Sequence, residues 1–278
     1  MPVPADRLAA LGQSGSAVIG LASGYRHVAG FVASVFSELR GVLGLPGTHG
    51  CVVVPVVPGA VLELAMADLG SAVPVVAREN PHWPYAVGAG DPWRVVDLTR
   101  TTAPMAPGVL GGVDVAFFCA SWVFGLPAGL TVVTLSPRAV AAARPTGLGA
   151  LFTPAPTVTD LVLLAHAVRD AADREPGALE RAARARLALV RDWAVDKPWV
   201  AEPPLRVGGD LVARVRVSAP ARAVAEIGEF LAAHHLAYGV TDPAVPGTLL
   251  IGLGETVPID DLERLLGLLA FLFDAVAG

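Results

Sequence analysis

Cysteine and charge are both scarce in this chain. Only two of its 278 residues are cysteine, Cys51 and Cys119, which excludes a disulfide framework, and their spacing does not fit a zinc site. Charged residues make up 16% of the chain and the net charge is -5, so the sequence lacks the basic stripe of a nucleic-acid-binding protein. We therefore expect a cytoplasmic protein that binds neither a metal ion nor nucleic acid.

One uncharged stretch, residues 115–137, is long enough to raise the question of a membrane span. Gly125, Pro127 and Gly129 divide it into two short β-rich runs, which are typical of buried parallel strands. The N-terminal residues 1–11 lack the continuous apolar region of a signal peptide. The sequence therefore predicts a protein without a membrane segment.

Strand and helix patterns alternate along the first part of the chain. We expect strands at residues 51–57, 75–77, 93–98, 115–120 and 130–135, helices at 33–43 and 60–69, and a loop at 80–92. Such alternation predicts an α/β fold with an open, mostly parallel sheet that is flanked by helices.

The second part of the chain has a different pattern. A long helical stretch, 157–193, is interrupted near Pro176. Further strands at 210–217 and 248–252 and helices at 221–234 and 259–276 predict a small α+β domain. We divide the chain into a large α/β domain of residues 1–190 and a small C-terminal domain of residues 191–278.

Residues 113–124 (VDVAFFCASWVF) resemble the strand and turn of class V, fold type I aminotransferases, in particular the phosphoserine aminotransferase branch. The similarity covers most of the chain, with the large domain truncated between residues 69 and 93, and the C-terminal part from Trp193 follows the family's small domain. In that family the residue equivalent to Trp122 is the lysine that binds pyridoxal phosphate. An indole has no amine that condenses with an aldehyde, so the resemblance implies that this Schiff base is lost.

Other positions that bind cofactor and substrate in the family are also changed. The turn after the first strand contains Pro55 and Pro58 and no Ser or Thr, although the family cradles the cofactor phosphate there with backbone N–H groups. Leu250 stands in place of the arginine that grips the substrate carboxylate. Phe152 stands in place of an Asn that the family contributes across its dimer.

Some family features have partial equivalents. Asp97 matches the carboxylate that pairs with the pyridine nitrogen, although a strand-end Asp also caps turns. Arg26 and His27 are displaced equivalents of the pair that binds the substrate phosphate. Lys197 is expected on the surface and not as a replacement Schiff-base lysine. We therefore predict a protein that uses no cofactor.

Cys119 is the strongest candidate for chemistry that remains. It lies three residues before Trp122, at the end of a strand where α/β sheets place ligands. Partnered by His27 or His82, it would be an acyl-transfer nucleophile, whereas a cysteine on an apolar strand is also an ordinary core residue. Cys51, in His49-Gly50-Cys51, has a histidine nearby in the sequence, but it lies at the start of its strand, away from the expected pocket.

Aromatic side chains are expected to line the former cofactor cleft. The residues that we assign to this substrate pocket are Trp122, Phe124, Asp97, Arg26, Trp83 and Tyr85. An aromatic cleft binds an apolar or amino-acid-derived ligand. Alternatively, the side chains fill the pocket, because an empty cavity costs on the order of 24 cal/mol per Å³.

Two functions follow from this pattern. The first is a repurposed, pyridoxal-phosphate-independent enzyme of bacterial specialised metabolism, which condenses or transfers an acyl group from a small-molecule or carrier-protein-bound substrate onto an amine. The second is a non-catalytic pseudo-aminotransferase, a binding or scaffold subunit in a homodimer or in a heterodimer with a related subunit. An open pocket beside Cys119 with a histidine in reach favours the first, and a filled pocket favours the second.

Overall fold

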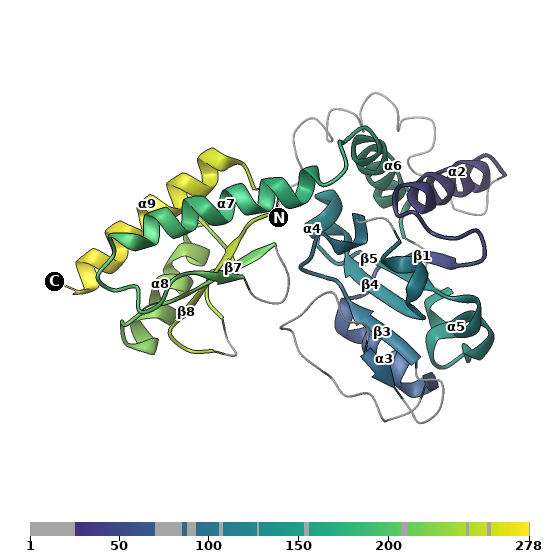
Figure 1. The fold of residues 1–278 in the computed structure, drawn as a ribbon, viewed down its shortest axis with the longest axis horizontal. Coiled ribbons are helices and arrows are strands. Elements are labelled where there is room, and N and C mark those ends of the chain that lie inside the picture. The colour runs from purple at the N-terminus through teal and green to yellow at the C-terminus, as the bar shows by residue number, and fades with distance from the viewer. Residues whose placement is uncertain are drawn as a thin grey trace. The chain divides into compact units, whose positions relative to one another are not determined.

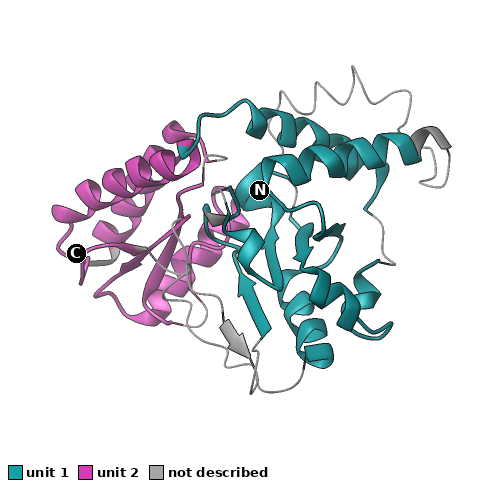
Figure 2. Ribbon diagram, turned by 45° about the vertical axis from the view of Figure 1, so that its right-hand side comes forward, with its two compact units in different colours: residues 1–177 teal, residues 178–278 magenta. Residues whose placement is uncertain are grey.

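The computed structural model describes residues 26–69, 85–87, 93–105, 108–126, 128–152, 156–206, 211–242, 245–254 and 257–277. The chain divides into two compact units, Met1–Gly177 and Ala178–Gly278, which are coloured teal and magenta in Figure 2. The predicted domain boundary after residue 190 falls inside helix α7 (Ala178–Val195), and the division at Gly177 keeps this helix whole.

The first unit is built on a sheet whose described strands have the order β1-β5-β4-β3-β2 (Figure 1). These strands are β1 (Gly50–Val54), β2 (Tyr85–Val87), β3 (Trp93–Asp97), β4 (Val115–Cys119) and β5 (Thr131–Leu135). Every residue of β4 and β5 is buried, as the two short β-rich runs predict for buried strands.

The α/β fold class is confirmed, but the sheet is mixed over its described strands and not mostly parallel. β3 and β4 are parallel, whereas β1 with β5, β5 with β4, and β2 with β3 are antiparallel. The segment between β4 and β5 is shorter than the dozen or so residues of a parallel crossover, so β5 returns antiparallel beside β4. Within the predicted loop at 80–92, residues 85–87 form β2, whose backbone pairs with β3. The rest of this segment and the predicted strand at 75–77 lie outside the described residues.

Helices cover this sheet on both sides. They are α2 (Arg26–Val42), α3 (Pro58–Leu69), α4 (Ala120–Phe124), α5 (Pro137–Ala142) and α6 (Val158–Ala172), with 3-10 turns η1 (Ala103–Met105), η2 (Leu110–Gly112) and η3 (Leu148–Phe152). α2 and α6 pack side by side (Figure 1). An ion pair joins them, in which Arg169 Nε lies 3.0 Å from Glu38 Oε2, and this hydrogen bond lowers the pKa of Glu38.

Helix boundaries follow local sequence features. The Thr157 side chain accepts a hydrogen bond from the Asp160 backbone N–H while the Asp160 carboxylate accepts from the Thr157 N–H, so a capping box starts α6. The predicted interruption near Pro176 is confirmed, since α6 ends at Ala172 and α7 begins at Ala178. A core cluster that includes Val54, Phe117 and Val133 then holds α3 against the sheet.

The second unit has the α+β composition that the sequence predicts. Its elements are α7, β6 (Leu205–Arg206), β7 (Val212–Arg216), α8 (Ala221–Ala233), β8 (Thr248–Gly252) and α9 (Ile259–Ala277), and the strands form an antiparallel sheet in the order β6-β7-β8. The ring of Trp199 stacks on Phe273 with centroids 4.5 Å apart, and its Nε1 donates to Asp274 Oδ1 at 2.9 Å. These contacts fix α9 to the segment that follows α7.

Among the described residues, no helix has both the length and the apolar character that crossing a membrane requires.

Candidate functional site

Three strands of the first unit end at the same edge of the sheet. β1 and β4 are both antiparallel to β5, and β3 is parallel to β4, so β1, β3 and β4 run in one direction. Their last residues are Val54, Asp97 and Cys119. In α/β sheets, ligands bind at the carboxyl ends of parallel strands, which makes this edge the candidate site.

Trp122 lies in the short helix α4, which starts directly after β4. Cys119 precedes the helix with extended backbone angles, and Gly125, at φ 63°, ends it in the left-handed conformation that glycine tolerates. The other four residues of α4 are buried, whereas Trp122 is half-buried. The helix therefore directs its indole away from the core.

The other predicted aromatic residues do not all belong to a cleft. Phe124 is 1% exposed and packs on Phe118, with ring centroids 6.2 Å apart, so it is a core residue and its assignment to the pocket is corrected. The helical period carries it to the buried face of α4, opposite Trp122. Trp83 lies outside the described residues, and only the backbone of Tyr85 is described, as part of β2.

Cys119 is buried, with 9% of its surface exposed. Its Sγ atom lies 2.9 Å from the hydroxyl oxygen of Ser121, two residues further on. The predicted base His82 and the side chains of His27 and Arg26 lie outside the described residues, although the backbone of the latter two begins α2. The described partner of the thiol is thus a hydroxyl group and not an imidazole.

Asp97 caps the turn that follows β3. Its Oδ1 atom accepts a hydrogen bond from the Thr99 backbone N–H at 2.9 Å and another from the Thr99 hydroxyl at 2.5 Å. This is the turn-capping role that a strand-end Asp commonly has. One carboxylate oxygen is therefore already engaged within the chain.

The turn between β1 and α3 offers few donors to an anion. α3 begins at Pro58, which has no N–H group, and the N–H of Ala60 donates to the Val57 carbonyl at 3.0 Å. The nearby hydroxyl of Thr131 donates to the Val56 carbonyl. A phosphate group needs several free N–H groups at a helix N-terminus, so this turn does not fit the phosphate of pyridoxal phosphate.

Leu250 occupies the position where the resemblance expects the arginine that binds the substrate carboxylate. Leu250 in β8 lies opposite Arg214 of β7 in the strand register. The guanidinium of Arg214 is paired with Asp242, with NH2 and Oδ2 3.2 Å apart and the Asp242 side chain 10% exposed. This arginine is therefore neutralised inside the second unit.

A buried histidine at the opposite edge of the sheet is a feature that the sequence patterns did not predict. His49 is 8% exposed, and among the described residues neither ring nitrogen has a hydrogen-bond partner. Desolvation, with a further contribution from Arg40, lowers the pKa of His49, and Asp114 opposes this shift. Desolvation likewise raises the pKa of Cys51 to about 12, so these two residues do not form an activated pair.

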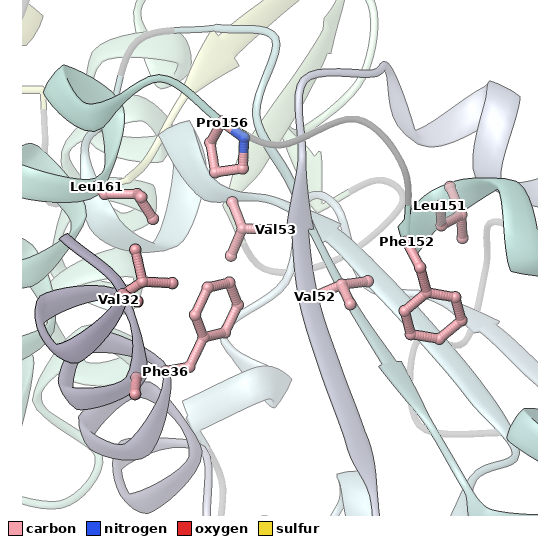
Figure 3. A pocket seen from close by; sticks show the side chains of 10 residues that line it. Val32, Phe36, Val52, Val53, Leu151, Phe152, Pro156 and Leu161 are labelled. Atoms are coloured by element: carbon pink, nitrogen blue, oxygen red, sulfur yellow. The ribbon is translucent and has the colours of Figure 1, made fainter. Parts of the chain in front are cut away.

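The first unit also contains an apolar cavity of about 380 Å³, between α2, β1, η3 and α6 (Figure 3). Helix α2 contributes Ala29, Val32, Ala33 and Phe36, which share one helical face. The helix predicted from the sequence begins at residue 33, so it omits the first turns of α2, which line this cavity. The helical spacing of these four residues is the pattern that reveals it.

The rest of the lining is equally apolar. It consists of Val52, Val53, Leu151, Phe152, Pro156 and Leu161. Figure 3 shows the rings of Phe36 and Phe152 on either side of the β1 residues. All the described lining side chains are apolar, so they match an apolar group better than a charged one.

No protein-family model and no curated protein sequence matches the chain. Solved structures do match its fold. A phosphoserine aminotransferase from Bacillus circulans subsp. alkalophilus shares 13% identity over 99% of this chain and 96% of that chain, with a TM-score of 0.70. The chain also matches an alanine–glyoxylate aminotransferase from Nostoc sp. at 15% identity, 98% and 92% coverage and a TM-score of 0.72.

A ureidoglycine–glyoxylate aminotransferase from Bacillus subtilis matches at 11% identity, with 100% of this chain and 92% of that chain covered and a TM-score of 0.71. At such identities the likeness concerns the fold. The chain has the fold of class V, fold type I aminotransferases, as the resemblance around residues 113–124 predicted.

Proposed function

We propose that this chain is a pyridoxal-phosphate-independent protein with an aminotransferase fold, which acts as a binding or partner subunit. The observation that carries the proposal is Trp122, a half-buried indole in the turn after β4, at the position where the resemblance expects the Schiff-base lysine. A covalent link to an aldehyde requires an amine, which this position lacks.

Three further features support the proposal, and each belongs to a different element. The turn before α3 has lost donors to proline, Asp97 is engaged by Thr99, and the carboxylate-binding position is Leu250. The loss of one group weakens binding, whereas changes at the covalent anchor, at the phosphate-binding turn and at the carboxylate-binding position act on three separate contacts with cofactor and substrate. The residues present do not fit the cofactor.

The burial of Cys119 favours a binding subunit over an acyl-transfer enzyme. A nucleophilic thiol must be accessible and is activated by a neighbouring base or cation. Cys119 is buried, and its described partner is the hydroxyl of Ser121. We therefore assign Cys119 to packing at the end of β4.

A dimer is part of this proposal, as a homodimer or as a heterodimer with a related subunit in the cytoplasm. It is supported by the match to the aminotransferase fold along nearly the whole chain. Sedimentation at micromolar protein concentration tests it. We expect twice the mass of the chain, and a monomer contradicts the proposal.

The proposal is tested by incubating the purified protein with pyridoxal phosphate, reducing it with borohydride and measuring its intact mass. We expect no stoichiometric adduct, because the described site has neither a lysine nor a phosphate cradle. A stoichiometric adduct on Lys197, the only lysine in the chain, would contradict the proposal.

A further inference from the structure

The turn between α2 and β1 encloses a histidine. His49 is the last residue before β1, and its backbone N–H donates to the Pro46 carbonyl at 3.0 Å. Only 8% of its surface is exposed, and neither ring nitrogen has a hydrogen-bond partner among the described residues. A neutral imidazole carries the cost of two desolvated nitrogens, whereas a protonated one adds a charge and a second N–H donor. The closed turn therefore disfavours a proton on His49.

A fixed positive charge is attached to the same turn. The guanidinium NH2 group of Arg40, in α2, donates to the carbonyl oxygens of Pro46 at 3.1 Å and of Gly47 at 2.7 Å. These two bonds connect the C-terminal end of α2 to the turn. Because an arginine side chain is always charged, Arg40 repels a proton on His49.

The carboxylate that acts on His49 is already engaged. Asp114, which precedes β4, favours a proton on the ring through its negative charge. Its Oδ1 atom accepts a hydrogen bond from the Ser136 hydroxyl at 2.8 Å, and its Oδ2 atom accepts one from the Arg94 backbone N–H at 2.9 Å. Both bonds hold the carboxylate in place, so it does not supply the acceptor that a protonated ring needs.

The other charged or titratable groups of the neighbouring elements are engaged or neutral. The Arg94 side chain donates to the Gly112 carbonyl at 3.1 Å, and the Arg138 guanidinium of α5 lies 3.9 Å from the centre of the Trp93 ring. Desolvation raises the pKa of Cys51 to about 12, so this thiol is neutral. Among the described residues, these groups leave water as the partner of a protonated His49.

The exposure of the turn allows it to move independently of the sheet. Gly44 and residues 46–48 are exposed and Leu45 is half-buried, so moving them uncovers little apolar surface. His49 lies outside β1, whose five residues all pair with β5. The turn therefore opens without breaking the hydrogen bonds between β1 and β5.

We propose that residues 44–49 form a proton-sensitive switch. When the His49 ring takes up a proton from water, the turn opens, the ring enters solvent and the sheet of the first unit stays folded. Opening separates Arg40 from its two carbonyl acceptors, so the C-terminal end of α2 loses this attachment. Release of the proton restores the buried neutral ring and both Arg40 bonds.

Hydrogen–deuterium exchange of the full chain tests this switch. Exchange is followed by mass spectrometry one pH unit above and one pH unit below 6.5, the ordinary pKa of the ring, and each rate is corrected for the pH dependence of intrinsic exchange. The ring of the opened turn is protonated at the lower pH, which favours the open state. We therefore expect the protection of residues 44–50 to fall about tenfold between the two pH values.

Two variants assign the effect to this ring. His49→Gln keeps a polar side chain that does not titrate, so the protection of the turn should be equal at both pH values. His234→Gln, at an exposed position in the second unit, should retain the tenfold change.

Low concentrations of urea separate opening of the turn from unfolding in the wild-type chain. The sensitivity of an opening reaction to urea grows with the surface that it exposes. Urea should therefore accelerate exchange in the buried strand β4 and leave exchange in the turn nearly unchanged.

Three results would overturn the proposal. Equal protection of the wild-type turn at both pH values means that the proton does not open it. A tenfold change that persists in His49→Gln means that another group titrates. Equal urea sensitivity of the turn and of β4 means that the turn opens only when the whole unit unfolds.

Discussion

The imidazole of His49 makes the stability of the first unit depend on pH. Desolvation lowers its pKa below the ordinary value of 6.5, so the folded state binds this proton more weakly than the unfolded state. The contribution of His49 to the free energy of unfolding is fully present above pH 6.5, the unfolded pKa, and is lost as the pH falls toward the folded pKa.

We therefore expect urea unfolding to show a stability that declines below pH 6.5. His49→Leu should flatten this dependence and should be at least as stable at neutral pH, because it removes two buried ring nitrogens without partners among the described residues. His234→Gln, at an exposed position, serves as the control and should leave the decline unchanged. A His49→Leu variant with the wild-type pH profile would contradict this account.

Both thiols should be unreactive in the folded protein. The pKa of Cys51 is raised to about 12 by desolvation, and Cys119 is buried beside Ser121. Iodoacetamide at neutral pH should label neither residue within the time in which it fully labels the urea-unfolded chain. Selective and rapid modification of Cys119 in the folded protein would revive the acyl-transfer hypothesis.

Single residues were predictable where a local pattern determines their role. Asp97 at a strand end predicted a capped turn, and the hydrogen bonds to Thr99 are that turn. The environment of His49 includes Arg40 in α2, nine residues earlier, and Asp114 before β4, which is distant in sequence. Phe124 was misplaced because α4 has only one half-buried position, and Trp122 occupies it.

At the scale of elements, the contact between α3 and η3 depends on one carboxylate. Asp68 Oδ2 accepts the backbone N–H groups of Arg144 at 2.9 Å and Leu148 at 2.7 Å. A Cβ atom on Gly147 would lie 1.9 Å from Asp68 Oδ1. Glycine at 147 is therefore required for the carboxylate to reach both donors.

We expect Gly147→Ala and Asp68→Ala each to lower the free energy of unfolding by about 1–3 kcal/mol, because both leave the two N–H groups without their acceptor. The double variant should cost less than the sum of the single variants. The control is Gly59→Ala in α3, where a Cβ atom meets open space and helix propensity favours alanine. Urea unfolding that shows additive effects would contradict this coupling.

Elements with strong periodic patterns were predicted well, and pairings were not. β4 and β5 match their predicted segments because short β-rich runs are local signals, and α6 ends before the interruption that Pro176 predicts. The direction of β5 depends on the short connection from β4, and β2 exists because it pairs with β3. Strand direction and strand pairing depend on tertiary contacts, which the alternation of elements along the sequence does not contain. The alternation therefore predicted a parallel sheet, whereas the described sheet is mixed.

At the scale of the whole molecule, the resemblance to aminotransferases predicted the fold, and the residues that differ from the family pattern are the basis of the proposed function. The fold is borne out by structures with 11–15% identity and TM-scores of 0.70–0.72. The proposed function depends on how many positions at the carboxyl edge of the sheet differ from the aminotransferase pattern. Either the lysine position alone differs, or several positions differ together. The features at Trp122 and Pro58 support alteration at more than one position of this edge.

Restoring the lysine alone distinguishes these alternatives most directly. Trp122→Lys is compared with Val195→Lys, which places a lysine at a 79% exposed site and measures non-specific reaction with the aldehyde. Both are titrated with pyridoxal phosphate, reduced with borohydride and analysed by peptide mass. We predict equal, weak labelling at positions 122 and 195, because the turn between β1 and α3 offers few N–H donors to a phosphate group. Stoichiometric labelling at position 122 alone would contradict the account.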